Sequence, residues 1–377
     1  VVHIACFHRP LDPRIFHKES RELAQAGHDV RLAAVGAPDE PIDGVRFIRL
    51  PEPKRRSLAG QLLEALRNCR RVTKTTRPDA YHFHEADMLP VMLMARLRGT
   101  KVIYDVHEDA PRQVVSRCKS LGVGWAGHAV SIYYRTLEWL GKRLFDAFIC
   151  ATPSIAKRFP AKRTVTVCNY PRLEEFEGDA STSSTPYAER PNRIVYAGGL
   201  TRMRGIIEIV RAMDLLSADL RVALDLAGTF APESLEAQAR AEPGWRHVRY
   251  HGWLARPELA AVLAQARVGL VILHPRPNYL DAFPTKMYEY MAAGIPVIAS
   301  DFPLWRSIVE DADCGLLVDP TDPEAIAKAI AWLLQHPDEA ATMGRNGRMA
   351  VERRYNWENE RVKLMQIYGA LQPDKTG

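Results

Sequence analysis

The segment between Asp281 and Gly294 contains the residues best suited to hold an anionic ligand. Glu289 lies within the run Met-Tyr-Glu-Tyr-Met-Ala-Ala, which leaves no side of the predicted helix 285–293 well solvated. Burying a carboxylate is costly unless it is paired or hydrogen-bonded, so Glu289 should have a partner. The vicinal hydroxyls of a ribose would serve, as they do in dinucleotide-binding folds. The alternative is an internal pair with Lys286, in which case Asp281 only caps the helix.

The start of the same helix is a candidate phosphate site. The first turn of a helix has free backbone N–H groups and the positive end of the helix dipole, and both favour a phosphate. Lys286 adds a full positive charge there. The candidate contacts at this helix start are Phe283, Pro284, Thr285 and Lys286.

A second segment, Val195–Gly205, follows a predicted strand and leads into a predicted helix. Gly198 and Gly199 would let the backbone approach a ligand closely, because glycine has no side chain. Arg202 and Arg204 follow at positions where an anion would arrive. The alternative is a solvated pair of arginines beside a tight turn.

Polar residues also end two apolar strands in the first half of the chain. The strand Val102–His107 ends in histidine, and the strand Ala80–Phe83 is followed by polar residues. Open α/β sheets bind ligands at the carboxyl ends of their strands, so these positions are candidates, although a histidine there is often structural. The residues after the earlier strand are His84, Glu85 and Asp87. We expect no metal site among them, because no distant ligand set completes one.

The loop after the first strand holds Asp12 and Arg14. Both are candidates for contacting a second substrate. Equally, both could be capping groups for the first helix.

These motifs together resemble a known family. Asp281, seven residues and then Glu289, followed by Tyr-Met-Ala-Ala-Gly-Ile-Pro-Val-Ile, is similar to the signature of the family 4 retaining glycosyltransferases, which have the GT-B fold. The family usually has Glu where this chain has Asp281. Its glycine-turn pattern, Gly-Arg-Leu-x-x-x-Lys-Gly, places Arg204 at the lysine and Gly199 where an arginine is usual.

The resemblance implies a hexosyl transfer from a nucleoside diphosphate sugar, UDP- or GDP-linked, with retention of configuration and without a metal or cofactor. It implies that the second domain holds the donor and that the first holds a sugar or lipid-linked acceptor. The implied catalytic residues are His107, Asp281, Arg204 and Lys286. The implied donor contacts are Gly198, Gly199, Arg202, Arg204, Phe283, Pro284, Thr285, Lys286 and Glu289. The implied acceptor contacts are Asp12, Arg14, His84, Glu85 and Asp87.

Two other functions fit the same pattern. An epimerase of nucleotide sugars would have the same architecture and would convert its substrate without an acceptor. The missing arginine at Gly199 also suits a protein that binds nucleotide sugars without catalysis. A dinucleotide oxidoreductase is disfavoured, because no GxGxxG follows the first strand.

The alternation of strands and helices positions these residues. It predicts an α/β protein of two doubly wound, Rossmann-like domains facing across a cleft, which is the GT-B fold. The predicted N-terminal domain spans residues 1–171, and an acidic and then Ser/Thr/Pro-rich linker spans 172–192. The C-terminal domain spans 193–355, and the helix at 356–377 crosses back to the first domain.

Charge is divided unevenly along the chain. Residues 1–170 carry 28 Lys and Arg against 17 Asp and Glu, whereas the remainder carries 23 against 28. Residues 54–77 combine eight basic residues with an apolar stripe of leucines, Cys69 and Val72. This basic amphipathic helix is a candidate for lying on an anionic membrane, with aromatic residues near Trp125 and Trp139 beside it. A solvated helix face is the alternative, and no nucleic-acid-binding motif is present.

The remaining composition suits a reduced, globular protein. The six cysteines are scattered without a CxxC pair, and no apolar run reaches the length of a membrane span. With no signal peptide visible, we expect a cytoplasmic location, at the inner face of the membrane if residues 54–77 bind lipid. Assembly of a bacterial cell-surface polysaccharide or glycolipid would fit these features.

Overall fold

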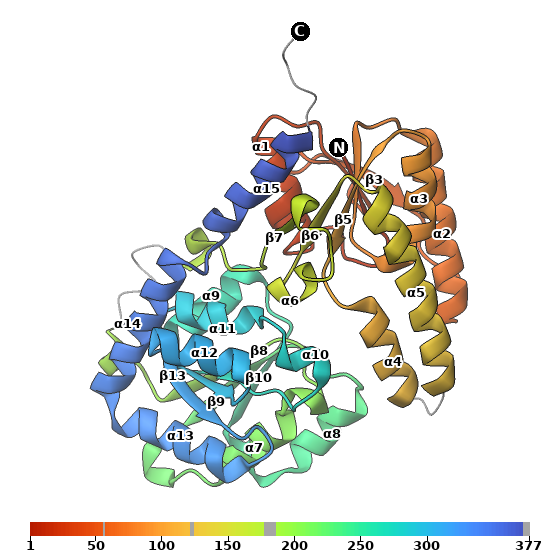
Figure 1. The fold of residues 1–377 in the computed structure, drawn as a ribbon. Helices are drawn as coiled ribbons and strands as arrows, with labels where there is room; N and C mark the ends of the chain where they lie inside the picture. The colour runs from red at the N-terminus through yellow and green to blue at the C-terminus, as the bar shows by residue number, and fades with distance from the viewer. Residues whose placement is uncertain (56, 121–123, 177–185, 372–377) are drawn as a thin grey trace. The chain divides into compact units, whose positions relative to one another are not determined.

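The computed structural model describes residues 1–377 except 56, 121–123, 177–185 and 372–377. Its contacts divide the chain into two units. The first unit contains Val1–Asn169 and Glu360–Gly377, and the second contains Tyr170–Asn359. Each unit is a parallel sheet covered by helices (Figure 1).

The first unit has a seven-stranded sheet in the order β3-β2-β1-β4-β5-β6-β7. All of its paired strands are parallel. The strand order reverses between β1 and β4, which is where doubly wound sheets open a crevice for ligands. The strands are β1 (Val2–Ala5), β2 (Arg31–Val35), β3 (Arg46–Leu50), β4 (Ala80–Phe83), β5 (Lys101–Val106), β6 (Ala147–Cys150) and β7 (Thr164–Thr166).

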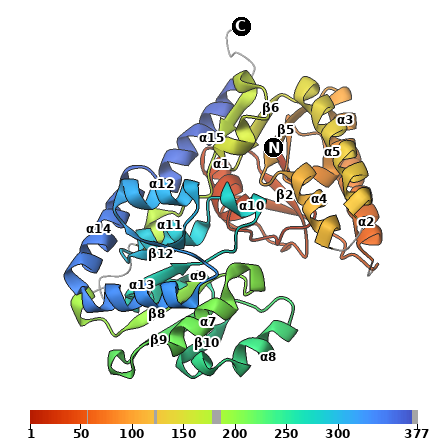
Figure 2. The ribbon, with the colours of Figure 1, turned by 60° about the horizontal axis from the view of Figure 1, so that its bottom comes forward.

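Helices cover both faces of this sheet. Their bounds are η1 (Ile15–Ser20), α1 (Arg21–Gln25), α2 (Leu58–Thr75), η2 (Ala86–Met88), α3 (Leu89–Leu97), α4 (Ala110–Ser120), α5 (Gly124–Leu144), α6 (Pro153–Ala156), η3 (Ala161–Arg163) and most of α15 (Trp357–Leu371). Helices α2, α3 and α5 lie side by side (Figures 1 and 2).

Alternate strand positions point to opposite faces, and in the first unit the two faces differ in polarity. Apolar strand residues, among them Ile4 and Phe83, form one core with residues of α2 and α3. The intervening positions include His3, His82 and Asp105, all completely buried. The sheet therefore has one ordinary apolar core and one polar, buried face.

The second unit has a six-stranded sheet in the order β10-β9-β8-β11-β12-β13. Its strands are also parallel, and its order reverses between β8 and β11. The strands are β8 (Arg193–Ala197), β9 (Ala223–Ala227), β10 (Val248–Gly252), β11 (Val268–Val271), β12 (Val297–Ser300) and β13 (Gly315–Val318).

Helices α9, α11 and α12 contact this sheet, and α13 packs with α7 and contacts β12 and β13 (Figure 1). The helices are η4 (Leu173–Phe176), η5 (Tyr187–Glu189), η6 (Arg202–Arg204), α7 (Ile206–Asp214), η7 (Ala218–Leu220), α8 (Ser234–Ala241), η8 (Pro243–His247), α9 (Arg256–Gln265), α10 (Pro277–Leu280), α11 (Thr285–Ala292), α12 (Pro303–Ala312), α13 (Pro323–Gln335) and α14 (Pro337–Arg353).

The described part of the predicted linker 172–192 packs on the second unit. The Tyr187 hydroxyl donates to the Arg267 carbonyl, and Arg190 donates to the Ala266 carbonyl. These contacts attach residues 187–190 to the second unit, which begins at Tyr170, before the first residue of β8.

The predicted basic amphipathic helix is α2. Cys69 and Val72 of its apolar stripe are buried in the core of the first unit, while Leu63 is 40% exposed. Cys69 and Val72, with Leu66 packed beside them, therefore hold α2 on its own unit. The side chain of Trp125 lies outside the described residues.

Five of the six cysteines are buried and all six are free, as the sequence predicted. Burial raises the pKa of the Cys6 and Cys69 thiols, so they are unreactive core residues. Within the described ranges, no helix is both long and apolar enough to cross a membrane.

Candidate active site

The two predicted anion-binding segments of the second unit meet at the point where its strand order reverses. The glycine turn follows the carboxyl end of β8, and α11 follows the loop after β11. A Cβ atom added at Gly198 would lie 3.2 Å from Lys286 Nζ. A Cβ atom at Gly199 would lie 2.8 Å from Arg204 Nη1. Two cations from different segments thus converge on a turn that has no side chains.

Lys286 is the most informative residue of this cluster. Its Nζ atom is enclosed and has no hydrogen-bond partner among the described residues. Nζ lies 3.4 Å from the ring centroid of Tyr196. Burial, together with the positive charge of Arg204, holds the pKa of Lys286 well below its usual value. Burial without an anionic partner disfavours the ammonium form of Lys286, so a bound anion would favour its charged state.

Arg204 is positioned by the next residue, Gly205, whose backbone has a left-handed conformation. Gly205 has φ +65° and serves as the N-cap of α7, where a Cβ atom would lie 2.5 Å from Cγ2 of Ile272. Only glycine fits there, because the conformation and the close contact both exclude a side chain. Arg204 Nη1 lies 3.4 Å from the Gly199 carbonyl oxygen, to which it donates. Its guanidinium therefore occupies the space beside Gly199, where the family pattern has an arginine.

Arg202 does not join this cluster. Its side chain is exposed and donates a hydrogen bond to Gln238. Residues Arg202 and Arg204 of η6 therefore contact different neighbours, and a contact between Arg202 and the donor stays a prediction.

Glu289 has an internal partner, but not the expected one. Its Oε1 accepts from Arg256 Nη1 at 2.5 Å, and Arg256 also pairs with Glu175. The side chain of Glu289 is 10% exposed, and its Oε2 makes no hydrogen bond or ion pair within the described residues. Lys286 does not pair with Glu289, so the structure contradicts the alternative of an internal pair between them. One carboxylate oxygen stays available for a ligand.

The remaining donor-site candidates surround the start of α11. Pro284 is its N-cap and Thr285 its first residue. Phe283 stacks against Tyr288 at a centroid distance of 6.3 Å. Asp281 is exposed and follows α10 directly.

In the first unit, His107 lies at the carboxyl end of β5 and is held by a buried carboxylate. Its Nε2 donates to Asp105 Oδ2 at 2.6 Å, and its side chain is 21% exposed. Burial alone would raise the pKa of Asp105, but Arg14 and His107 hold that pKa well below its usual value. A charged Asp105 fixes the His107 tautomer with the proton on Nε2, which leaves Nδ1 as an acceptor.

Arg14 belongs to the same buried network. It makes a bidentate pair with Asp105 at 2.8 and 3.0 Å and lies 3.0 Å from Glu19. Its side chain is 5% exposed. The expectation that Arg14 contacts an acceptor is corrected by this burial, because its guanidinium is used by two internal carboxylates.

Asp12 and His84 also have structural partners. Asp12 Oδ1 accepts from the backbone N–H groups of Arg14 and Ile15, which is the capping alternative. His84 is buried and donates from Nδ1 to Asp105 at 3.1 Å. Neither arrangement matches the expected role in binding an acceptor.

Glu85 orients a second histidine at the reversal point of this sheet. Glu85 Oε1 accepts from the Phe7 backbone N–H and from His8 Nδ1, both at 3.0 Å. The rings of His8 and His107 meet edge to face at a centroid distance of 5.4 Å. Asp87 accepts a hydrogen bond from the Tyr134 hydroxyl. Two imidazole–carboxylate pairs therefore lie side by side at this edge.

Comparison with known proteins agrees with this geometry. Residues 14–169 match the family described as glycosyl transferase 4-like domain, and residues 179–350 match glycosyl transferases group 1. The two matches together cover most of the chain. The chain belongs to the group 1 glycosyltransferases. Its resemblance to this family, stated above on the motifs, is thereby confirmed.

Three proteins illustrate the relationship of this glycosyltransferase to others. The MMP alpha-(1->4)-mannosyltransferase of Mycolicibacterium hassiacum is 27% identical over 180 residues, which are 47% of this chain and 43% of that protein. The sucrose-phosphate synthase of Thermosynechococcus elongatus superposes with a TM-score of 0.74 at 24% identity, over 98% of this chain and 99% of that one. Anabaena Alr3699/HepE, in complex with UDP-glucose, superposes with a TM-score of 0.71 at 14% identity, over 98% and 99%. The predicted GT-B fold is confirmed.

Among the residues of the glycosyltransferase that the structure describes, two groups of side chains have the composition of metal ligands. The ligand atoms of His3, Glu19, His82 and His84 lie within 4.8 Å of one another, as do those of His84, Asp105 and His107. The guanidinium of Arg14 lies between Glu19 and Asp105 and would repel a cation. Burial and the charge of Asp105 raise the pKa of Glu19 well above its usual value, so a proton can neutralise it. These residues fit a protonated network better than a metal ion.

Sequence reasoning missed the partners that hold the site residues of the glycosyltransferase. Asp105 could have been found from the sequence, because a charged residue in the middle of an apolar strand indicates a buried charge that needs a partner. His8 could also have been found, because it follows the first strand directly. Arg256 could not have been found in this way, because nothing in the sequence around it relates it to Glu289, which lies 33 positions away in the chain.

Proposed function

We propose that this chain transfers a hexosyl group from a nucleoside diphosphate sugar, with UDP or GDP as the nucleotide, to an acceptor hydroxyl. The observation that carries the proposal is the unpartnered Lys286 Nζ beside Arg204 at the glycine turn. A diphosphate would supply the anion that this cluster lacks. The Anabaena protein in complex with UDP-glucose supports a nucleotide sugar as the donor.

In this proposal the second unit binds the donor and stabilises the leaving group. Lys286, Arg204 and the first turn of α11 would neutralise the charge that develops on the departing diphosphate. Preorganised charges of this kind lower the barrier without a metal ion. Glu289 Oε2 would accept from a ribose hydroxyl while Arg256 holds Oε1. Asp281 would lie near the donor sugar, as the family resemblance implies.

The first unit would bind the acceptor beside His107. The free Nδ1 of His107 suits a hydrogen bond from a sugar hydroxyl, because Asp105 holds the proton on Nε2. Retention of configuration would follow from front-face substitution, in which the departing phosphate accepts the proton of the acceptor. Glu85 and Asp87 would act through His8 and Tyr134, which they bind.

A donor-binding experiment tests this function. The thermal unfolding midpoint of the full chain is measured with a panel of nucleotide sugars, with and without acceptor extracts. A donor at 100 times its dissociation constant stabilises by about 2.7 kcal/mol and should raise the midpoint. Lys286→Met should abolish that rise while the ligand-free midpoint stays within a few degrees. A rise of equal size in the Lys286→Met variant would contradict the donor site.

Incubation of the donor with the chain, followed by analysis of the products, separates the alternatives. Conversion of the donor sugar without any acceptor would indicate an epimerase, an alternative that the relatives named above do not support. Donor binding without transfer or hydrolysis above background would indicate a binding protein.

We further propose that the acceptor belongs to a bacterial cell-surface polysaccharide or glycolipid and that the enzyme works at the cytoplasmic face of the membrane. The basic residues of α2 support this, together with exposed apolar residues on α5. Ile132, Tyr133 and Trp139 are 65%, 51% and 49% exposed. Cosedimentation with vesicles of phosphatidylglycerol, compared with vesicles of phosphatidylcholine, tests the contact. No difference in bound protein between the two would contradict it.

A further inference from the structure

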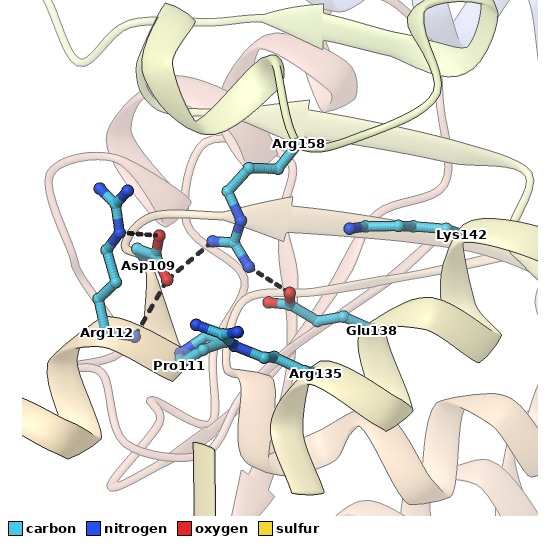
Figure 3. A pocket seen from close by; sticks show the side chains of 7 residues that line it. All are labelled: Asp109, Pro111, Arg112, Arg135, Glu138, Lys142 and Arg158. Carbon is cyan, nitrogen blue, oxygen red and sulfur yellow. Dashed lines mark hydrogen bonds and ion pairs between the residues drawn. The ribbon is translucent and has the colours of Figure 1, made fainter. Parts of the chain in front are cut away.

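The first unit contains a cavity of about 320 Å³ that the proposed reaction does not use (Figure 3). It lies at the carboxyl ends of β5 and β6. Asp109 follows β5 and accepts the backbone N–H of Arg112 at the start of α4. Arg158 follows α6, which comes after β6. His107 stands two residues before Asp109, so the cavity and the candidate acceptor site share one strand end.

The lining of this cavity is strongly charged. The residues that line it are Asp109, Pro111, Arg112, Arg135, Glu138, Lys142 and Arg158. Four cationic side chains face two carboxylates, which leaves an excess of two positive charges. Concave sites lined mainly by one sign of charge attract ligands of the opposite sign.

The two carboxylates already have partners, which fixes the frame of the cavity. Arg158 pairs with Glu138 and with Asp109, the latter at 2.9 Å (Figure 3). Arg112 also pairs with Asp109, at 3.4 Å. Because Glu138 is nearly completely buried, Arg158 is held in one position. The carboxylates serve to orient Arg158.

Two cationic side chains of the lining are available to bind a ligand. Within the part of the chain that the structure describes, the side chains of Arg135 and Lys142 make no hydrogen bond or ion pair. Both lie on α5, seven residues apart, which places them on one side of that helix. Lys142 Nζ lies 4.9 Å from the centroid of the Phe159 ring, which limits its freedom.

We propose that this cavity binds a phosphate group carried by the acceptor substrate. The inference rests on the proposed function, because it assigns the ligand to the acceptor that the first unit would bind. A phosphate monoester carries close to two negative charges near neutral pH, which matches the excess positive charge of the lining. Guanidinium groups bind phosphate through paired hydrogen bonds, and the lining offers several. The phosphate would anchor the acceptor while its hydroxyl reaches His107.

The test measures binding of inorganic phosphate and pyrophosphate by calorimetry to the full chain. All proteins carry Arg204→Gln and Lys286→Met, so that the donor site cannot hold the anion. Adding Arg135→Gln and Lys142→Gln should weaken binding by roughly tenfold or more, because charged hydrogen-bond partners are lost. The matched control is Arg143→Gln, which removes one charge from α5 outside the cavity lining and stacks on Trp139. It should change the affinity less than about twofold, by the small effect of surface charges.

Equal weakening by Arg143→Gln would overturn the proposal, and so would unchanged affinity in the Arg135→Gln/Lys142→Gln variant. Absence of binding to the parent protein at millimolar phosphate would also overturn it. Lys142→Arg keeps the charge and should keep the affinity, which separates loss of the ligand from loss of folding. This experiment measures binding of phosphate and not turnover. A negative result would therefore not affect the proposed donor site, and absence of sugar transfer would not affect the binding result.

A second arm identifies the source of the phosphate. Vesicles of phosphatidylcholine with phosphatidic acid present the group on a lipid, and glucose 6-phosphate presents it in solution. Binding to either one that is lost in the Arg135→Gln/Lys142→Gln variant supports the site and names its source. Binding to both that is unaffected by those substitutions would count against it.

Discussion

In both units the strand order reverses between the first and the fourth strand, and in both the loops at that point carry the candidate site residues. The second unit places Lys286 and Arg204 there, around a turn without side chains. The first unit places two histidines there, each bound to a carboxylate. The same topology thus supports two kinds of chemistry, because the two sheets are alike while the residues of their loops differ.

The two sites also differ in how their charges are compensated. In the first unit the charge of Asp105 is compensated within the protein by Arg14 and His107. In the second unit Lys286 Nζ has no hydrogen-bond partner among the described residues. A charge compensated within the protein stabilises the fold, whereas an uncompensated one can gain free energy from a ligand. The first site is therefore expected to matter for stability and the second for binding.

The largest expected effect is on the stability of the first unit. Asp105→Asn leaves the Arg14 guanidinium with Glu19 and the Val167 carbonyl, and breaking such a buried pair costs about 3–5 kcal/mol. Urea unfolding of the variant and of the parent chain measures this loss. Asp39→Asn, which removes an exposed partner of Arg49, is the control and should change stability by less than about 0.5 kcal/mol. Similar losses in both variants would show that the buried network has no special role.

The next effect is on catalysis by the second unit. Lys286→Met should reduce kcat/KM by about 100- to 1,000-fold, because one preorganised charge at the leaving group is lost. Steady-state kinetics of transfer measures it. Lys328→Met, at an exposed position of α13, is the matched control and should leave turnover unchanged. Stability should hardly fall, or should rise, because the buried Nζ has no partner in the unliganded protein.

A smaller effect is expected at Glu289. Glu289→Gln should weaken donor binding by about tenfold through the loss of a charged acceptor for the ribose. Glu175→Gln removes only the other partner of Arg256 and should change the affinity less than about twofold. Titration of both variants with the donor decides this. If both substitutions weaken the donor equally, Glu289 acts only through Arg256.

The smallest effect is a pH dependence in the first unit. Burial lowers the pKa of His8, but the hydrogen bond and charge of Glu85 outweigh it, so the pKa lies above its usual value in the folded protein. Such a group stabilises the fold below its unfolded pKa of about 6.5 and loses that contribution as the pH rises through its folded pKa. The difference in unfolding free energy between the parent and His8→Asn should be less than about 1 kcal/mol and should shrink with rising pH. A difference that grows with pH would contradict the pair.

The sequence was sufficient for the features that depend on neighbouring residues. The alternation of strands and helices predicted both sheets, since periodicity reports burial locally. The predicted glycine turn and the helix from 285 are present, because a tight turn and a helix start are local properties. Their binding of an anion stays a prediction. The sequence did not decide whether residues 54–77 bind a membrane. An apolar stripe predicts that one face of a helix is buried, but it does not identify the surface that covers that face. In the structure, Cys69 and Val72 lie in the core of the first unit.

Only the tertiary structure decided which charges meet. Arg14 is separated from Asp105 by 91 residues and Arg256 from Glu289 by 33, and no local pattern relates the members of either pair. The structure also pairs Arg202 with Gln238 and brings His8 beside His107. Secondary structure follows from the period of apolar residues along the chain. Charge pairing depends on which strands become neighbours and how their ends align, and this is fixed only when the sheet is assembled.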